Sequence, residues 1–135
     1  MATVIDQAAI EVYRRFIEDG ASLSDAAVME SMLAPGIELP TVGEGGVAAL
    51  LGMHQAMRAG FPDMRATIDE ALESGEWVAA RLTWAGTHTG EFAGIAATGR
   101  TVSVTEFEIV RIEQGRVVEL RNVLDLASLM TQLTA

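Results

Sequence analysis

Hydrophobic positions follow a helical period through the first part of the chain. In residues 3–19 the apolar side chains recur at steps of three and four, at Ile5, Ala9, Val12 and Phe16. This spacing predicts an amphipathic helix that ends at Gly20. Residues 26–33 predict a second, short helix, and residues 47–59 predict a third that ends at Gly60.

Caps and breakers mark the connections between these helices. Ser24 or Asp25 is expected to cap the second helix, because short polar side chains accept hydrogen bonds from the first free backbone N–H groups. Pro35-Gly36 is expected to stop it. Residues 36–41 then predict a short strand, and Pro40 indicates that this strand lies at a sheet edge.

The pattern changes to strand-like segments in the second half. Strands are predicted over residues 64–73, 77–88, 100–112 and 115–124. Short glycine turns between these segments indicate antiparallel hairpins, and Asp125 is expected to cap a closing helix over residues 125–133. Helices followed by a strand meander predict a single α+β domain over residues 1–135. We expect a cone-shaped barrel, in which a curved, mostly antiparallel sheet wraps around a pocket and the N-terminal helices pack on it.

Composition narrows the functional class. The chain has 135 residues with 9 basic and 19 acidic side chains, a net charge of −10. This charge argues against nucleic acid and anionic membranes as partners, since both are bound by clustered Lys and Arg. The chain has no cysteine, which excludes disulfides, thiolate catalysis and zinc–thiolate sites. Because there is no signal-peptide pattern and no apolar run of roughly 18 residues, we expect a cytoplasmic protein.

Four segments carry a resemblance to a known family. They are F-P-D at residues 61–63, G-T-H-T-G-E-F at 86–92, T-G-R at 98–100, and the C-terminal run 111–133. Together with the order of elements, they resemble the SnoaL-like polyketide cyclase family of the nuclear transport factor 2-like superfamily. The resemblance implies intramolecular aldol ring closure without metal or organic cofactor, at a site that pairs a His with an acid/base Asp. It also implies a homodimer formed through the outer face of the sheet.

The residues at the implied site depart from the family pattern. His88 falls on the family's His, but Asn122 stands where the proton-transferring Asp is expected, and Arg121 replaces the Trp before it. An Asn side chain donates and accepts hydrogen bonds and does not exchange a proton near neutral pH. Asp125 matches a second acidic position, which we interpret as structural. The departure at Asn122 argues against the standard cyclase mechanism.

Two related families suggest other sites. The chain resembles limonene epoxide hydrolase in the C-terminal run, with Arg81 as the Arg of an Asp-Arg-Asp site, but Asn122 and Thr83 replace its acids. It resembles ketosteroid isomerase near I-E-L-P and F-E-I-V-R, where the base falls on Leu39 and the oxyanion-stabilising acid on Glu108. Since Leu39 cannot act as a base, neither site is complete.

A separate source of acid/base groups follows from the alternation in residues 101–111. One face of this predicted strand carries Val102, Val104, Glu106, Glu108 and Val110. If that face lines the pocket, both carboxyls lose solvent and repel each other, which raises a pKa toward the range of a general acid or base. In the opposite orientation, Phe107 and Ile109 face the core and the glutamates face solvent.

The remaining candidates each have a functional and a structural interpretation. His88 has the titration range of a proton shuttle, or it is a strand-end His satisfied by the neighbouring hydroxyls. Arg81 stabilises an enolate, or it pairs with one of the many acids. His54 and Trp84 belong to the pocket or to the core. With the two His far apart in sequence, we expect no metal site.

We therefore predict a cofactor-independent enzyme that acts on a hydrophobic, polyketide-like ligand by proton transfer, in a cyclisation, an isomerisation or an epoxide opening. The candidate catalytic residues are His88, Glu106, Glu108 and Asn122. The candidate substrate-binding residues are Arg81, Thr83, Trp84, Leu39 and His54. The alternatives are a non-catalytic protein that binds a small molecule, which Asn122 favours, and a hydrolase that opens an epoxide beside Arg81.

Overall fold

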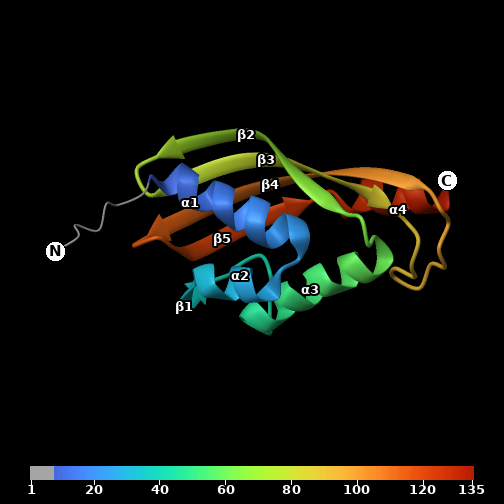
Figure 1. Ribbon diagram of the computed structural model, residues 1–135, viewed down its shortest axis with the longest axis horizontal. Helices are drawn as coiled ribbons and strands as arrows, with labels where there is room; N and C mark the ends of the chain where they lie inside the picture. The colour runs from blue at the N-terminus through green and yellow to red at the C-terminus, as the bar shows by residue number, and fades with distance from the viewer. Residues whose placement is uncertain (1–7) are drawn as a thin grey trace.

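A curved sheet and a layer of helices make up the molecule (Figure 1). The computed structural model describes residues 8–135, and within them five strands form one sheet in the order β1-β5-β4-β3-β2. The strands are β1 Leu33–Glu38, β2 Arg65–Ser74, β3 Trp77–Thr87, β4 Thr101–Glu113 and β5 Arg116–Leu124. The helices are α1 Ala9–Arg15, α2 Ala26–Met32, α3 Gly46–Gly60 and α4 Leu126–Thr134. Figure 1 shows α1, α2 and α3 together along the concave side of the sheet.

The predicted α+β class and the mostly antiparallel meander are confirmed. Antiparallel pairing joins β2 to β3, β3 to β4 and β4 to β5, whereas β1 pairs parallel to β5 at one edge. The strand order begins at β1 and ends at β2, so the sheet is mixed and does not close into a barrel. The interior is therefore bounded by the sheet on one side and by helices on the other.

The connection between α2 and β1 differs from our prediction. We predicted a helix that runs to residue 33 and a strand over residues 36–41, but α2 ends at Met32 and β1 begins directly at Leu33. Pro35-Gly36 lies inside this strand instead of separating the two elements. A proline is tolerated there because an edge strand has a neighbour on one side only.

The helix ends agree largely with the predicted caps. Asp25 rather than Ser24 caps α2, because its Oδ1 accepts a hydrogen bond from the Val28 N–H at 3.1 Å. Asp125 caps α4 as predicted and accepts a hydrogen bond from the Ser128 N–H at 3.0 Å. The first predicted helix continues past α1 as a π-helical turn over Phe16–Gly20, and Ile5 lies outside the described residues.

The alternation along β4 determines what lines the inner face of the sheet. Its buried positions are Val102, Val104, Glu106, Glu108, Val110 and Ile112. Phe107 and Ile109 point to the outer face, where their side chains are 57% and 48% exposed. Of the two orientations that the sequence left open, the structure has the one in which both glutamates point inward.

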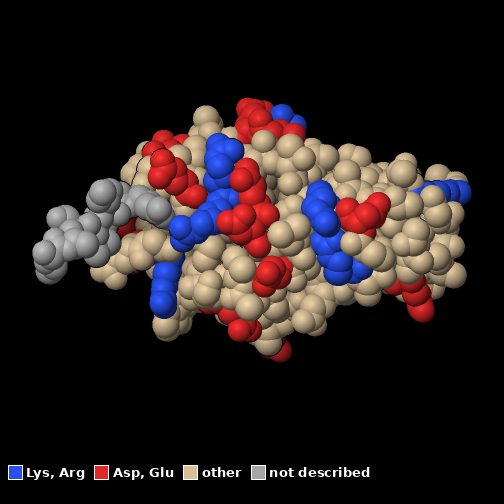
Figure 2. Space-filling model, viewed as in Figure 1, with Lys and Arg blue, Asp and Glu red and all other residues tan. Residues whose placement is uncertain are grey.

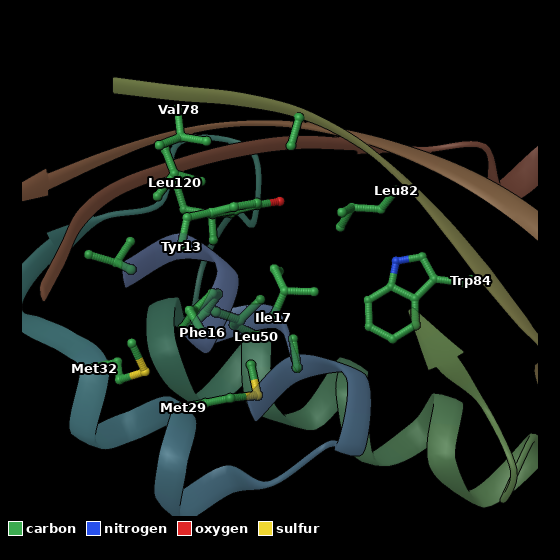
Figure 3. Close-up of a cluster of buried hydrophobic side chains, with 14 of the residues drawn as sticks. Tyr13, Phe16, Ile17, Met29, Met32, Leu50, Val78, Leu82, Trp84 and Leu120 are labelled. Atoms are coloured by element: carbon green, nitrogen blue, oxygen red, sulfur yellow. The ribbon is translucent and has the colours of Figure 1, made fainter. Parts of the chain in front are cut away.

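Apolar side chains from both layers fill the space under the sheet (Figure 3). The helical layer and the π-helical turn contribute Tyr13, Phe16, Ile17, Met29, Met32 and Leu50, and the sheet contributes Val78, Leu82, Trp84 and Leu120. Burying one large apolar side chain of this kind contributes about 1.5–3 kcal/mol relative to leaving it exposed. This packing holds the helices against the inner face of the sheet.

Charged side chains on the face shown in Figure 2 lie in mixed groups. Blue Arg atoms lie beside red Asp and Glu atoms there and form no single basic patch. This face therefore lacks the clustered positive charge that binds nucleic acid. None of the helices in residues 8–135 is long and apolar enough to cross a membrane.

The segment after β3 is fixed against the end of α3. The sequence T-H-T-G, residues 87–90, begins at the last residue of β3. The Gly60 carbonyl accepts hydrogen bonds from the Thr89 N–H at 3.2 Å and the Gly90 N–H at 3.0 Å. Asp63 accepts from the backbone N–H and the hydroxyl of Thr87 at 2.7 and 2.8 Å. A Cβ atom at Gly90 would lie 2.0 Å from the Ala59 carbonyl oxygen, so only glycine permits this approach.

Replacing Gly90 by Ala should therefore destabilise the protein by about 2 kcal/mol or more, because backbone atoms have to move apart. The measurement is the free energy of unfolding in urea. Gly52→Ala is the matched control, since nothing lies within 4 Å of a Cβ atom at Gly52 in the middle of α3. That control should stabilise the helix by up to about 1 kcal/mol. Equal stability of the Gly90 variant and the wild type would contradict the close approach.

Candidate active site

Two buried carboxyl groups lie next to each other on the inner face of β4. The side chains of Glu106 and Glu108 are two positions apart and belong to residues only 7% and 6% exposed. They border a small cavity of about 60 Å³ under the sheet. Helix α3 lines this cavity with Leu50, Met53, His54 and Met57. The cavity therefore combines an apolar wall with two ionisable groups.

Glu106 accepts hydrogen bonds at both carboxyl oxygens. The indole Nε1–H of Trp84 donates to Oε1 and the amide Nδ2 of Asn122 donates to Oε2, each at 2.8 Å. The Asn122 side chain is itself held, because the Thr41 hydroxyl donates to its Oδ1 at 2.7 Å. Strands β3 and β5 on either side of β4 thus supply both partners of this carboxyl.

Within residues 8–135, Glu108 accepts one side-chain hydrogen bond, from the hydroxyl of Tyr13 on α1, which donates to Oε1 at 2.7 Å. Burial, and then the neighbouring charge of Glu106, raises the pKa of Glu108 well above its ordinary value. Burial also raises the pKa of Glu106, although the bonds from Asn122 and Trp84 oppose this shift. Burial and the charge of Glu108 raise the pKa of Tyr13, so its hydroxyl stays protonated.

His54 faces the same cavity from α3. Its ring centroid lies 5.8 Å from that of Trp84 at an interplanar angle of 54°. Burial, and then the charge of Arg58, lowers the pKa of His54 to about 4. The ring is therefore neutral at pH 7 and can both donate and accept a hydrogen bond from a ligand.

His88 lies away from the two glutamates. It follows β3, six residues beyond Leu82, which pairs with Glu106 in the sheet, and this offset corresponds to about 20 Å along a strand. The ring is fully buried beside Phe61 at a centroid distance of 5.2 Å. Its Nδ1 accepts a hydrogen bond from the Thr98 N–H at 3.2 Å. The structure therefore places His88 in the anchoring of the 89–99 connection and does not bring it to the cavity.

Arg81 and Thr83 lie on the outer face of the sheet. The Arg81 guanidinium lies 2.9 Å from Glu70 and 3.5 Å from Asp69, and the Thr83 hydroxyl donates to Asp69. The buried carboxyls point to the opposite face, so the structure does not assemble an epoxide-opening site of Arg81 and an acid. Leu39 follows β1 and packs against the core without lining the cavity.

The sequence prediction missed two residues of this site. Tyr13 is the only tyrosine of the chain and lies between Val12 and Phe16 on the apolar stripe of the first predicted helix, which was a usable signal. Thr41 carries no signal in the sequence, since its role depends on the pairing of β1 with β5. Within residues 8–135, no group of three or more His, Cys, Asp or Glu side chains is placed to hold a metal ion.

Comparison with known proteins identifies the family of the chain. The sequence model of the SnoaL-like polyketide cyclases matches residues 11–133. The chain belongs to this family. Glu106 and Glu108 therefore lie in the cavity of a SnoaL-like chain in which position 122 carries an amide.

Two aklanonic acid methyl ester cyclases are similar in sequence to part of the chain. The chain is 38% identical to aklanonic acid methyl ester cyclase DnrD of Streptomyces peucetius over 53 residues, which cover 39% of this chain and 37% of that protein. The corresponding DauD of Streptomyces sp. strain C5 is 38% identical over 50 residues, 37% of this chain and 31% of that protein. The matched segments thus span only about a third of the length of these curated relatives.

Solved structures share the fold over nearly the whole chain. IdmH of Streptomyces antibioticus superposes with a TM-score of 0.83 and 26% identity, over 96% of this chain and 100% of that one. AclR of Streptomyces galilaeus superposes with a TM-score of 0.85 and 24% identity, over 93% and 95% of the two chains. At this identity the likeness to AclR shows the fold alone.

The raised pKa of Glu108 has a consequence for stability. The folded protein holds this proton more tightly than the unfolded chain, so wild-type stability should fall as pH rises above the ordinary value of 4.5. Glu108→Gln removes this loss, and we expect the variant to be more stable than wild type by at least about 1 kcal/mol near pH 8, with the difference shrinking toward about pH 4. Urea unfolding at several pH values measures it.

The exposed Glu91→Gln is the control for this experiment, since Glu91 lies outside the cavity. It should show the same dependence of stability on pH as the wild type. Parallel pH profiles for Glu108→Gln and wild type would contradict a raised pKa at Glu108.

Proposed function

We propose that the chain is a cofactor-independent enzyme that moves protons on a hydrophobic, polyketide-like ligand. The observation that supports this proposal is the Glu106–Glu108 pair, two carboxyls enclosed with apolar side chains in one cavity. A carboxyl whose pKa is raised toward neutrality is an effective general acid or base. Two such groups side by side offer one site for removing a proton and one for supplying it.

Ring closure by an intramolecular aldol reaction uses both functions. One carboxylate removes a proton from carbon next to a carbonyl, and the resulting enolate attacks a second carbonyl of the same molecule. The oxygen of that second carbonyl takes up a proton from the other carboxyl, so the product is an isomer of the substrate. The name of the related aklanonic acid methyl ester cyclases supports this reaction class for the chain. An isomerisation would share the first step.

The experiment is incubation with aklanonic acid methyl ester in D2O, followed by chromatography and mass spectrometry. We expect a product with a new retention time and, apart from any deuterium taken up, the same mass as the substrate. Alternatively, we expect the substrate itself to take up deuterium next to a carbonyl. Glu106→Gln and Glu108→Gln should each lower the rate by about 10²–10⁴-fold, the usual contribution of one general acid or base. Glu91→Gln should keep the wild-type rate.

The enzyme proposal is overturned if the ligand binds but forms no product and exchanges no hydrogen for deuterium. The chain would then be a SnoaL-like protein that binds a small molecule without turnover, the alternative that the amide of Asn122 favours. Binding is measured independently by quenching of Trp84, which lines the cavity, in a Trp77→Phe background.

We also propose that two copies of the chain associate through the outer face of the sheet. Large apolar side chains are exposed there on four neighbouring strands, at Leu72, Trp77, Phe107, Ile109 and Val123. Arg81 and Glu70 lie among them, so a second copy related by a two-fold axis would bring both apolar area and opposite charges to this face.

Phe107→Glu should convert the homodimer into a monomer, because it introduces a charge into the centre of this apolar face. Sedimentation equilibrium of wild type and variant measures the mass. Leu126→Glu is the matched control, since Leu126 is 50% exposed on α4 and lies outside this face. A wild type that stays monomeric, or a control that dissociates as well, would overturn this interface.

A further inference from the structure

We infer that Asn122, held in one orientation by Thr41, divides the roles of the two glutamates, so that Glu106 carries the negative charge and Glu108 carries the proton. The catalytic meaning of this division rests on the proposed function, whereas the division itself rests on hydrogen bonds within the site. It assigns a positioning role to the residue that departs from the family pattern.

The partners of Glu106 are the first part of the argument. The indole N–H of Trp84 can only donate, and it occupies Oε1. The amide of Asn122 occupies Oε2 at 2.8 Å. A proton on either oxygen of Glu106 would meet one of these N–H groups, so the arrangement fits the carboxylate.

The orientation of the Asn122 amide is set by Thr41. The Thr41 hydroxyl oxygen accepts a hydrogen bond from the Asn122 backbone N–H at 3.0 Å. The hydroxyl hydrogen is then free to donate to Oδ1 of the same residue at 2.7 Å. With Oδ1 occupied, Nδ2 points to Glu106. The opposite amide orientation would place Oδ1 against Glu106 and leave the Thr41 hydroxyl without this acceptor.

Glu108 differs from Glu106 in its surroundings. It accepts one hydrogen bond, from Tyr13, and has no second N–H or O–H donor among the described contacts. Neither Lys nor Arg belongs to the described cavity lining, and the titratable groups that face the pair are Tyr13 on α1 and His54 on α3, both uncharged near pH 7. A second negative charge beside Glu106 would be unpaired, so the proton that the pair retains belongs on Glu108.

The register of the sheet explains why an amide suits position 122. Asn122 pairs directly with Glu108 across β4 and β5 and reaches Glu106 by its side chain. An ionised Asp at 122 would place a third carboxyl group beside this pair and would donate no hydrogen bond to Glu106. With an amide at position 122, the charged group of the site therefore lies on β4 and not on β5.

The test is a ¹³C NMR titration of the glutamate carboxyls in the full chain, assigned with Glu106→Gln and Glu108→Gln. We expect two steps, the lower one at Glu106 and the higher one at Glu108. Asn122→Leu should raise the Glu106 step by about one pH unit or more, because it removes a donor to the carboxylate. Thr41→Val should shift the same step in the same direction by less, since the amide stays but loses its fixed orientation.

Thr67→Val is the control for Thr41→Val, because Thr67 is exposed and lies outside the cavity. It should leave both steps unchanged. An amide fingerprint spectrum establishes that each variant is folded, and Thr41→Val at the exposed Thr41 tests the inference if Asn122→Leu does not fold. The inference is overturned if Glu108 titrates first, or if the folded variants at positions 41 and 122 leave Glu106 unmoved.

The outcome is separate from that of the proposed function. If the chain turns over no ligand while the two steps and their shifts are as expected, the enzyme proposal fails and the division of charge stands. If turnover is found and Glu108 titrates first, the enzyme proposal stands and the roles of the two glutamates are reversed.

Discussion

Burial of two neighbouring carboxyls is the constraint on which the rest of this structure depends. An ionisable group withdrawn from water is costly unless it finds hydrogen-bond partners. Here the partners come from three separate parts of the chain, Tyr13 on α1, Trp84 on β3 and Asn122 on β5. A fourth part, Thr41 beyond β1, holds the side chain of Asn122. The fold brings these segments around β4, and the cavity lies where they meet.

The parallel edge strand has a specific part in this arrangement. Because β1 runs parallel to β5, the chain leaves β1 at the same end of the sheet at which Asn122 lies, and Thr41 arrives beside it. An antiparallel edge strand would leave at the other end. The topology of the edge and the chemistry of the interior are therefore linked through a single hydroxyl group.

The sequence was informative where a pattern is local. The alternation in residues 101–111 predicted the glutamate face, and Asp25 and Asp125 are caps that their neighbours in sequence make recognisable. The prediction was less useful where position depends on pairing over long distances. Arg81 and Trp84 belong to one strand, and only the sheet register shows that Trp84 reaches Glu106 while Arg81 faces outward.

His88 illustrates the same limit in a different way. In the G-T-H-T-G-E-F segment, Gly90 lies two residues after His88 and makes the close approach to the end of α3. The family resemblance suggested a catalytic role for His88. A resemblance in sequence does not show how far His88 lies from Glu106 along the sheet. His54, a weaker candidate in the sequence, is the histidine that borders the cavity.

The loose packing of α3 has a consequence for how a ligand arrives. Only Leu50 and Gly60 of this helix are buried, and Gly43, Gly45 and Gly46 before it adopt positive φ angles of 84°, 96° and 51°. A cavity of about 60 Å³ is far smaller than the roughly 300–1,000 Å³ that encloses a typical small-molecule ligand. Admission of a polyketide-sized molecule thus requires an open form, and the apparent affinity equals the intrinsic affinity reduced by the fraction of molecules in that form.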